Sequence, residues 1–372
     1  KLQDLAVPTG PLRVLNDRAL TFVRKSIKAN RNERYGSFKE MLEDLKKIER
    51  RTLELGSEKF ELESYLGKGG FGEVFKARRI SDGKSFAVKH LFPGLDPSRF
   101  HREARLLEKY PHPNLVGYVG FSTVERLDGE EHYLFLEFLE GMPQWGLRGR
   151  IKSEGAFDEE EVRRLFVDYL TALDFLHTAH RKPILHRDIT PANLYAPPQK
   201  GREGTRIPGK IFDMGIARSE QTLTGGHVPG NPEYMAPEFV TESDFRGSVQ
   251  SDIYCLGLCM YESLTGKPAF ERLSRETAEM WSSLKARADG KVAIRFDYDV
   301  FRLHPNLERF VQKATARNPK QRFQSAREML AALKAMGTTD EGRDLEMAMD
   351  PADRAELSAA TVFVPEGDAA QA

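Results

Sequence analysis

The run ILHRDITPANLY, at residues 184–195, holds the two side chains on which the interpretation of this sequence depends most. Asp188 and Asn193 stand five positions apart, so one short loop can aim both side chains at the same ligand. A third such group, Asp213, follows in KIFDMGIAR at residues 210–218. These three residues are therefore the first candidate site.

A glycine-rich run lies far upstream of this loop. The sequence LGKGGFGEVFKA, at residues 66–77, places Gly67, Gly69 and Gly72 in G-x-G-x-x-G spacing. Glycine lets the backbone approach phosphate oxygens and offer N–H donors without a Cβ clash. The spacing alone also fits a plain turn or a dinucleotide-binding fold. A dinucleotide fingerprint opens a helix, whereas EVFKARRI has a strand pattern, so we predict a strand–loop–strand hairpin.

Two charged residues follow the glycine-rich run. Lys89 ends the apolar run FAVK, and Glu103 lies in HREARLLEKY, which has helical periodicity. Taken singly, the lysine could be a strand-end surface residue and the glutamate part of a solvated helix face. The roles of Lys89 and Glu103 depend on whether the two side chains contact each other in the folded protein.

In this order the motifs resemble those of the protein kinase superfamily, in particular the eukaryotic-like serine/threonine protein kinases. PEYMAPE at residues 232–238 extends the likeness, because A-P-E closes the activation segment of that family. The resemblance covers about 280 residues. It implies transfer of the γ-phosphoryl group of ATP, with Mg²⁺ as cofactor, to serine or threonine hydroxyls of protein substrates.

The resemblance also assigns roles to single residues. Asp188 would accept the substrate hydroxyl proton, while Asn193 and Asp213 would hold Mg²⁺. Lys89 would bind the α- and β-phosphates, and Glu103 would orient it, since a buried ammonium needs an acidic partner. Gly215 would be a pivot after the metal ligand. The nucleotide would be lined by Leu66, Gly67, Gly69, Gly72, Val74, Ala87, Lys89, Leu136, Leu194 and the backbone of Glu137 and Leu139.

Local patterns predict two lobes of different kinds. From residue 58 to about 138, short β-rich runs surround one helical stretch, SRFHREARLLEKY. From about 142 to 336, helical periodicity dominates. We therefore predict an α+β protein with the two-lobed kinase fold over residues 58–336. Residues 51–57 would be a linker, and 337–372 a flexible acidic tail.

The first fifty residues resemble the end of the predicted kinase domain. Residues 22–46 and 310–334 align without gaps, and eleven of 25 positions are identical, including Asn30 with Asn318 and Arg34 with Arg322. Identical polar residues at turn positions are not set by helical periodicity. Residues 1–50 are thus interpreted as the last helices of a preceding kinase-like domain. A divergent helical extension docked on this domain, or a chance match of amphipathic helices, would be the alternatives.

Composition excludes several classes of protein. The chain has 56 basic and 56 acidic residues, so no overall charge indicates binding to nucleic acid. No apolar run approaches the roughly 18 residues of a membrane span, and no signal peptide pattern is present. The two cysteines, Cys255 and Cys259, are four apart in a predicted buried helix, where core packing is the simpler interpretation than zinc binding. We expect a cytoplasmic protein.

Several positions depart from the family pattern. Thr190 stands where serine/threonine kinases have a lysine, and Ala192 where tyrosine kinases have an arginine. Asn231 replaces the threonine expected before A-P-E, and Met214 replaces the phenylalanine after the metal ligand. Losing one such electrostatic contact costs roughly 2.7–4 kcal/mol of transition-state stabilisation when nothing replaces it. The alternative to an active kinase is therefore a nucleotide-binding pseudokinase that acts as a scaffold or allosteric partner. A small-molecule kinase is disfavoured by the complete activation segment.

The resemblance also indicates regulation and two structural anchors. Arg187 precedes the catalytic aspartate, which in this family implies that phosphorylation orders the activation segment. The candidate sites there are Ser219, Thr222 and Thr224, with Thr361 in the tail as another. Glu238 is expected to pair with Arg322 under the large lobe, while Asp252 and Gly257 match the helix that anchors the catalytic loop.

Overall fold

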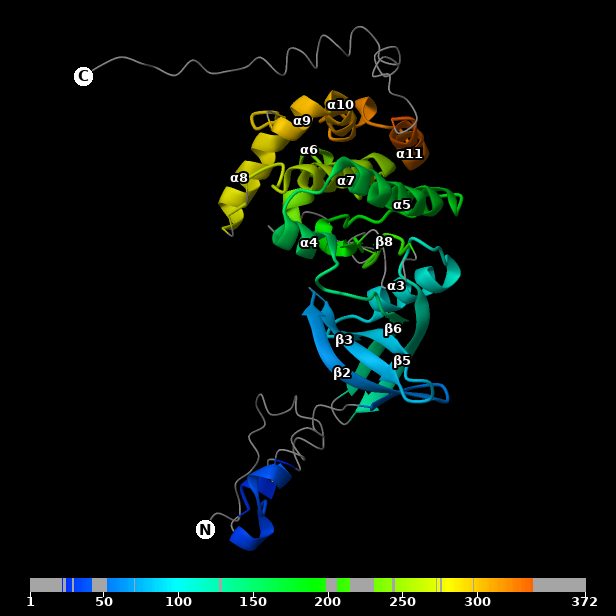
Figure 1. Cartoon of the computed structure of the whole chain (residues 1–372), viewed down its shortest axis with the longest axis vertical. Coiled ribbons are helices and arrows are strands. Elements are labelled where there is room, and N and C mark those ends of the chain that lie inside the picture. The colour runs from blue at the N-terminus through cyan, green and yellow to red at the C-terminus, as the bar shows by residue number, and fades with distance from the viewer. Residues whose placement is uncertain are drawn as a thin grey trace, which may run out of the picture.

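We analysed a computed structural model of the chain. It describes residues 22, 25–28, 30–41, 52–69, 71–126, 129–198, 206–214, 231–242, 245–271, 273–274, 276–296 and 298–336. Figure 1 shows a β-rich lobe below a helical lobe, with the described part of residues 22–41 beyond the sheet. The predicted α+β fold with two lobes is confirmed.

The small lobe is a six-stranded antiparallel sheet with one helix against it. The strand order is β1-β2-β3-β4-β6-β5. Its elements are β1 (Thr52–Leu55), β2 (Glu58–Lys68), β3 (Gly72–Arg79), β4 (Ser85–Leu91), α3 (Ser98–Lys109), β5 (Tyr118–Arg126) and β6 (Gly129–Glu137). The helix α3 is the stretch predicted from SRFHREARLLEKY. The β2–β3 hairpin around the glycines has the predicted strand–loop–strand form.

Alternation along the strands gives the sheet two different faces. One face, called the outer face below, carries a compact apolar cluster that includes Phe60, Val88 and Phe135. Successive side chains of a strand point to opposite faces, so the residues between them face the other way. That second face carries Lys89 and the apolar residues predicted to line the nucleotide.

The large lobe packs helices around α7, which is buried along nearly its whole length. Its elements are α4 (Leu147–Glu154), α5 (Glu159–Thr178), η3 (Pro191–Asn193), β7 (Leu194–Tyr195), β8 (Lys210–Ile211), η6 (Pro232–Tyr234), α6 (Glu238–Thr241), α7 (Val249–Thr265), α8 (Thr277–Ala288), α9 (Asp299–Leu303), α10 (Pro305–Ala314), η7 (Pro319–Gln321) and α11 (Ala326–Ala335). Within the described residues, no helix is both long enough and apolar enough to be a membrane span.

Local sequence fixes the two ends of α7. The side chain of Ser248 accepts a hydrogen bond from the backbone of Ser251, whose hydroxyl accepts one from Ser248 in return. Gly266 ends the helix in the left-handed region, at φ 69°. Between these ends, Cys255 and Cys259 are buried free thiols, and burial raises the pKa of both. Both are core residues, as the simpler interpretation predicted.

The sheet begins earlier than the sequence indicated. Residues 52–55 were assigned to a linker, but they form β1 and pair with β2. Leu53 is buried in the apolar cluster of the outer face, which explains why this short segment joins the sheet. The strand β5 and the helices α4, α6, α8 and α9 were not predicted either. The four-residue α6 and the five-residue α9 carry too few residues for a clear period, whereas β5 and α8 are as long as elements that were predicted.

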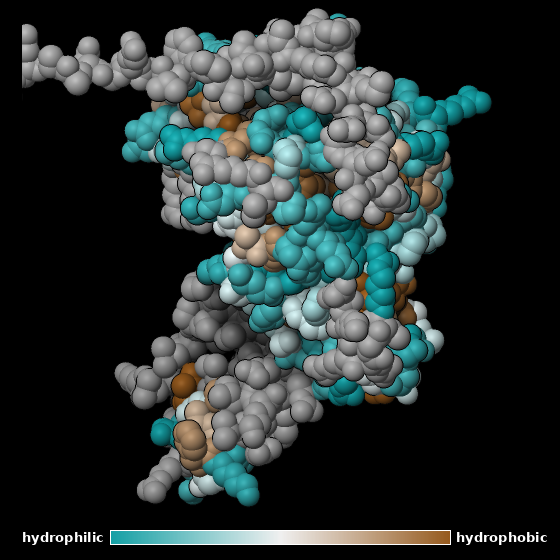
Figure 2. Space-filling model, turned by 45° about the horizontal axis from the view of Figure 1, so that its top comes forward, coloured by the Kyte–Doolittle hydropathy of each residue, from teal (hydrophilic) through white to brown (hydrophobic). Residues whose placement is uncertain are grey.

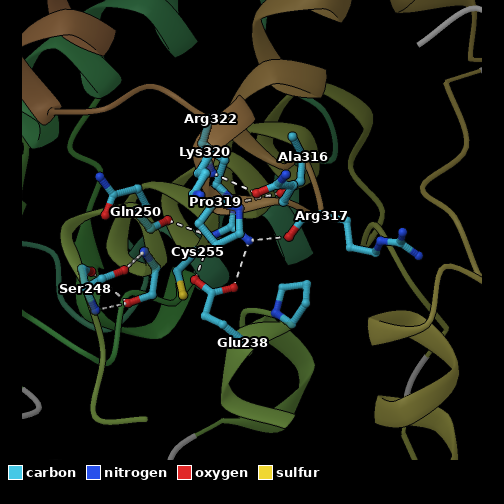
Figure 3. A network of polar contacts seen from close by, with 12 residues as sticks. Glu238, Ser248, Gln250, Cys255, Ala316, Arg317, Pro319, Lys320 and Arg322 are labelled. Carbon is cyan, nitrogen blue, oxygen red and sulfur yellow. Dashed lines mark hydrogen bonds and ion pairs between the residues drawn. The ribbon is translucent and has the colours of Figure 1, made fainter. Parts of the chain in front are cut away.

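A buried ion pair joins the A-P-E segment to the end of the domain (Figure 3). Arg322 binds Glu238 through two hydrogen bonds, of 2.7 and 2.8 Å, and the side chains are 0% and 2% exposed. The arginine also donates to the carbonyls of Ala316, Gln250 and Arg317. All five N–H groups of the guanidinium are therefore used, as a buried charge requires.

We predict that Arg322→Ala lowers the free energy of unfolding by about 3–5 kcal/mol, because the substitution leaves the Glu238 carboxylate buried without its partner. Urea denaturation followed by circular dichroism measures this. Arg327→Ala is the matched control, since Arg327 pairs with Asp174 at the surface and is 71% exposed. Its loss should cost less than about 1 kcal/mol. Equal losses for the two variants would contradict this account of the ion pair.

Candidate active site

The register of β4 decides which face carries Lys89. Val88 lies opposite Phe135 on the outer apolar face. Lys89 lies opposite Val74 on one side and Leu134 on the other, on the face that looks away from that cluster. A slip of one residue would exchange Lys89 with Val88. The buried outer face therefore also fixes the position of the ammonium.

The Lys89 ammonium bridges two carboxylates from different parts of the chain. Its Nζ lies 2.9 Å from Glu103 Oε2 and 2.5 Å from Asp213 Oδ1. Burial alone would lower the pKa of Lys89, but the two carboxylates outweigh burial and raise it. Burial raises the pKa of Glu103, and the Lys89 charge opposes that rise. The lysine stays charged because both acids are close, and the predicted Lys89–Glu103 pair is present in the structure.

The helix α3 aims Glu103 inward because the glutamate shares a face with apolar residues. Phe100 precedes it by three positions and Leu107 follows by four, and both are buried. Residues at these spacings lie on one side of a helix. Glu103 is itself 7% exposed, so the interpretation as a solvated helix face is wrong.

A two-stranded ribbon brings Asn193 and Asp213 to the same place. Leu194 in β7 pairs with Ile211 in β8 in antiparallel register. The residue before β7 and the residues after β8 therefore lie at one end of the ribbon. The backbone N–H of Phe212 donates to Asn193 O over 3.1 Å. Asp213 then adopts φ 58°, in the left-handed region that few residues other than glycine adopt.

Asp188 and Asn193 meet as their five-residue spacing predicted. Asn193 Nδ2 donates to Asp188 Oδ2 over 3.0 Å and to the Asp188 carbonyl over 2.8 Å. The intervening residues form the single turn of η3, in which Asn193 N–H donates to Thr190 O. Because its amide nitrogen is the donor, the amide oxygen of Asn193 is the group that could bind a cation.

Asp252 at the start of α7 holds the backbone that leads into Asp188. Its carboxylate accepts the backbone N–H of His186 over 2.8 Å and that of Arg187 over 2.9 Å. It also lies 3.1 Å from His177 Nε2. Arg187 adopts φ 64°, a conformation that needs such support. A buried carboxylate thus fixes the backbone just before Asp188.

The predicted nucleotide lining lies on the face of the sheet that carries Lys89. Ala87 faces Leu136 across the β4–β6 pair, and Val74 faces Lys89 across β3–β4. Leu194 is fully buried in the main apolar core, and Ala87 packs against that core. Leu66 in β2 is partly buried. Apolar residues from both lobes therefore surround one side of the sheet.

Some of the backbone N–H and C=O groups predicted to bind the base already have hydrogen-bond partners within the protein. The Glu137 N–H donates to Gly117 O over 2.9 Å, so its carbonyl is the group that could bind a base. The Leu139 carbonyl accepts from Met142 N–H over 3.2 Å, which leaves the N–H of Leu139 for the same purpose. One acceptor and one donor two residues apart suit the edge of a purine base.

The three glycines of the loop are needed for different reasons. A Cβ on Gly72 would lie 2.2 Å from the carbonyl oxygen of His90, so no other residue fits there without a shift. A Cβ on Gly67 would meet nothing within 4 Å, and one on Gly69 only the Gly72 carbonyl at 3.9 Å. The last glycine is required by packing, whereas the first two leave open space in which a ligand could approach the backbone.

Comparison with known proteins decides the family. Residues 60–333 match the protein kinase domain. The chain belongs to the protein kinase family. The serine/threonine-protein kinase PknB of Mycolicibacterium smegmatis is 32% identical over 332 residues, which is 83% of this chain and 49% of that protein. The serine/threonine-protein kinase pkn3 of Myxococcus xanthus is 30% identical over 319 residues, covering 82% and 54%.

These matches confirm the resemblance to eukaryotic-like serine/threonine protein kinases and the assignment as a kinase of that class. The chain spans about half the length of the curated relatives it matches. The tandem arrangement inferred from residues 1–50 stays a prediction, as do the roles of the site residues.

Of the positions that depart from the kinase pattern, Asn231, Thr190 and Met214 have local structural roles. Asn231 Oδ1 accepts the N–H of Glu233 and so caps η6. Thr190 is 4% exposed and begins η3. Met214 is 4% exposed in the main core, which fits its interpretation as an apolar filler. Gly215, Ser219, Thr222, Thr224 and Thr361 lie outside the described residues.

Sequence reasoning missed two residues that support the site. Lys210 in β8 lies 2.6 Å from Glu137 at the end of β6, an ion pair that joins the two lobes beside the backbone predicted to bind the base. Asp168 on α5 accepts the Gly209 N–H over 2.8 Å and pairs with Arg206, which holds the chain entering β8. Both are single charged residues in ordinary sequence surroundings, and only the fold shows their partners.

The Asp252 contacts lead to a prediction about pH. Burial alone would raise the pKa of Asp252, but the hydrogen bond and charge of His177 and the Arg187 N–H lower it overall. A lowered folded-state pKa stabilises the fold above the ordinary aspartate pKa of about 3.9, and this contribution is lost as the pH falls through the folded value. We expect Asp252→Asn to cost about 1.5–3 kcal/mol at pH 7.

The difference between wild type and Asp252→Asn should shrink as the pH drops below about 4. Urea denaturation at pH 7, 5, 4 and 3 measures it. Asp174→Asn, which removes only the surface pair with Arg327, is the control and should cost less than about 1 kcal/mol throughout. A difference for Asp252→Asn that stays constant or widens in acid would contradict the role given to this carboxylate.

Proposed function

We propose that the chain is an ATP- and Mg²⁺-dependent kinase that phosphorylates serine or threonine hydroxyls of protein substrates. The observation that supports this most is the meeting of groups from both lobes: Lys89 contacts Glu103 and Asp213, while Asp188 contacts Asn193 beside them. The relatives' names, serine/threonine-protein kinases, support the substrate class. Two buried free thiols suit a reducing compartment, which supports a cytoplasmic setting.

The residues present suit a nucleotide and a divalent cation. Mg²⁺ is usually held by one or two protein oxygens together with substrate phosphates and water. The carboxylate of Asp213 and the amide oxygen of Asn193 are such a set. When bound, Mg²⁺ would neutralise charge on the phosphate oxygens. Lys89, kept charged by its two acids, would bind the α- and β-phosphates, and Glu103 would still hold it.

Asp188 is the group proposed to take the substrate hydroxyl proton. Its carboxylate is oriented by the Asn193 amide, and its backbone N–H donates to His186 Nδ1 over 3.2 Å. A base positioned in this way contributes typically 10²–10⁴-fold to a rate. Phosphoryl transfer otherwise depends on positioning and electrostatic stabilisation, which the other residues supply.

The pseudokinase alternative has less support. It was based on Thr190 and Asn231, yet both take part in local turns that shape the loop. The acids, the amide and the lysine needed for transfer are present and meet in space. The absent lysine at position 190 would lower the rate of such an enzyme without removing its metal ligands or its base.

We predict that Asp188→Asn and Asp213→Asn each lower autophosphorylation, or phosphorylation of a general acceptor protein, by at least about 10²-fold. The reason is that one substitution removes the base and the other a metal ligand. Radiolabelled ATP with Mg²⁺ measures the transfer. Asp289→Asn, an exposed aspartate at the end of α8, is the control and should retain activity. Equal incorporation in all four proteins would refute intrinsic kinase activity.

Regulation by phosphate on the activation segment is part of this proposal. The Nε of Arg187 is buried and has no hydrogen-bond partner among the described residues. Burial lowers the pKa of Arg187, which Asp252 opposes and the nearby charge of Arg246 reinforces. A cation held in this way favours an anion beside it. Phosphorylated Ser219, Thr222 or Thr224 would supply one from the segment between Asp213 and Glu238.

We expect active protein to carry phosphate on at least one of Ser219, Thr222 and Thr224, as peptide mass spectrometry would show. Removing it with a phosphatase should lower activity about tenfold or more, since hydrogen bonds to charged groups are worth about 1.5–3 kcal/mol. Arg187→Ala should make the activity insensitive to the phosphatase. Fully active protein with all three residues unmodified would contradict this proposal.

A further inference from the structure

The described residues between 22 and 41 repeat local contacts that residues 310–329 make in the kinase domain. Phe22 and Tyr35 pack their rings with centroids 5.4 Å apart, as Phe310 and Phe323 do at 5.0 Å. Lys25 pairs with Glu40 over 2.7 Å, as Lys313 pairs with Glu328 over 3.0 Å. Each residue of the first set precedes its counterpart by 288 positions, since 310 − 22 = 288.

The polar turn between the two parts is also repeated. Asn30 Oδ1 accepts the N–H of the residue two positions on over 3.1 Å, and Asn318 does so over 3.0 Å. The 3₁₀ turns that follow, Arg31–Glu33 and Pro319–Gln321, correspond as well. These hydrogen bonds depend on particular side chains, so amphipathic periodicity alone does not explain them.

The arginine of the turn makes the same local contact in both copies. Arg34 Nε donates to Lys28 O over 2.7 Å, and Arg322 Nε donates to Ala316 O over 2.6 Å. In the kinase domain the remaining N–H groups reach Glu238 and two more carbonyls. Arg34 Nε thus makes the same backbone contact as Arg322 Nε, while the other two nitrogens of Arg322 bind the Glu238 carboxylate.

The two copies differ in how deeply their side chains are buried. Arg34 is exposed, and among the described residues no carboxylate pairs with it, whereas Arg322 is 1% exposed. Phe38 is 81% exposed and its counterpart Ala326 1%. Ile27 is 61% exposed and its counterpart Thr315 8%. Figure 2 shows apolar surface on this N-terminal segment, at the lower left.

The kinase domain described here cannot bury the exposed side chains of the N-terminal segment in the equivalent position. Its own residues 310–329 already occupy the equivalent position, and Glu238 already binds Arg322 on both oxygens. A second copy of the chain would have the same position filled. A helical lobe that lacks its own closing segment would offer this position to residues 22–41.

We propose that residues 22–41 close the helical lobe of a second kinase-like domain, in which a buried glutamate binds Arg34. Glu238 precedes Arg322 by 84 positions. The same spacing places the partner of Arg34 in sequence before residue 1, so the occupant is a kinase-like domain immediately upstream in the same polypeptide. Such a chain would carry two kinase-like domains in series, which extends the proposed function without depending on it.

The test uses the natural polypeptide with the sequence that precedes residue 1, followed by differential scanning calorimetry. Arg34→Ala should lower the melting temperature of the upstream domain by roughly 6–20 °C and leave the transition of residues 52–336 unchanged. Arg322→Ala should do the converse. Lys39→Ala, an exposed position on the same segment, is the control and should move neither transition.

A charge exchange keeps the test decisive if Arg34→Ala prevents the upstream domain from folding. Arg34→Glu should destabilise the upstream domain, and replacing the acidic residue 84 positions before it with arginine should restore the transition. The proposal is overturned if the upstream sequence has no acidic residue there, if Arg34→Ala moves only the transition of residues 52–336, or if it moves none.

Discussion

The Lys89 ammonium is taken out of water on the inner face of the sheet, and two carboxylates offset the cost of that burial. Glu103 comes from the helix of the small lobe, whereas Asp213 follows the β7–β8 ribbon of the large lobe. The contact therefore holds only when α3 is turned inward and the lobes are correctly placed. It links the packing of the protein to its proposed chemistry, since these groups would bind the phosphates and the metal.

Two buried carboxylates fix backbone segments of the large lobe in a comparable way. Asp252 fixes the backbone before Asp188. Glu238, paired with Arg322, fixes the A-P-E segment to the last helices of the domain. Each is a buried charge whose hydrogen bonds are satisfied, an arrangement that is costly to disturb and that specifies one geometry. These contacts fix the backbone before Asp188 and the A-P-E segment, and Asp188, Asn193 and Asp213 lie between these two points in the sequence.

Sequence reasoning predicted the parts of this protein that depend on motifs and long periods. Asp188 and Asn193 were found through their five-residue spacing, Lys89 through the order of the motifs around it, and α7 through its long apolar run. It missed β1, which is four residues long and is decided by Leu53 packing on a sheet formed elsewhere. It also missed the Lys210–Glu137 pair, because no local pattern marks two charges that meet across 73 positions (210 − 137). Burial and long-range pairing are properties of the fold and leave little trace in a short window of sequence.

The central claim is that Lys89 lies against the phosphates of bound ATP, and an acyl-phosphate derivative of ATP tests it most directly. Such a reagent transfers its acyl group to a lysine amine near the phosphates, and peptide mass spectrometry identifies the lysine. We predict acylation of Lys89, suppressed by excess ATP with Mg²⁺, and none that ATP suppresses at Lys76 on the same face of the sheet. Acylation of Lys89 that is absent, or that is unaffected by competing ATP, would contradict the account.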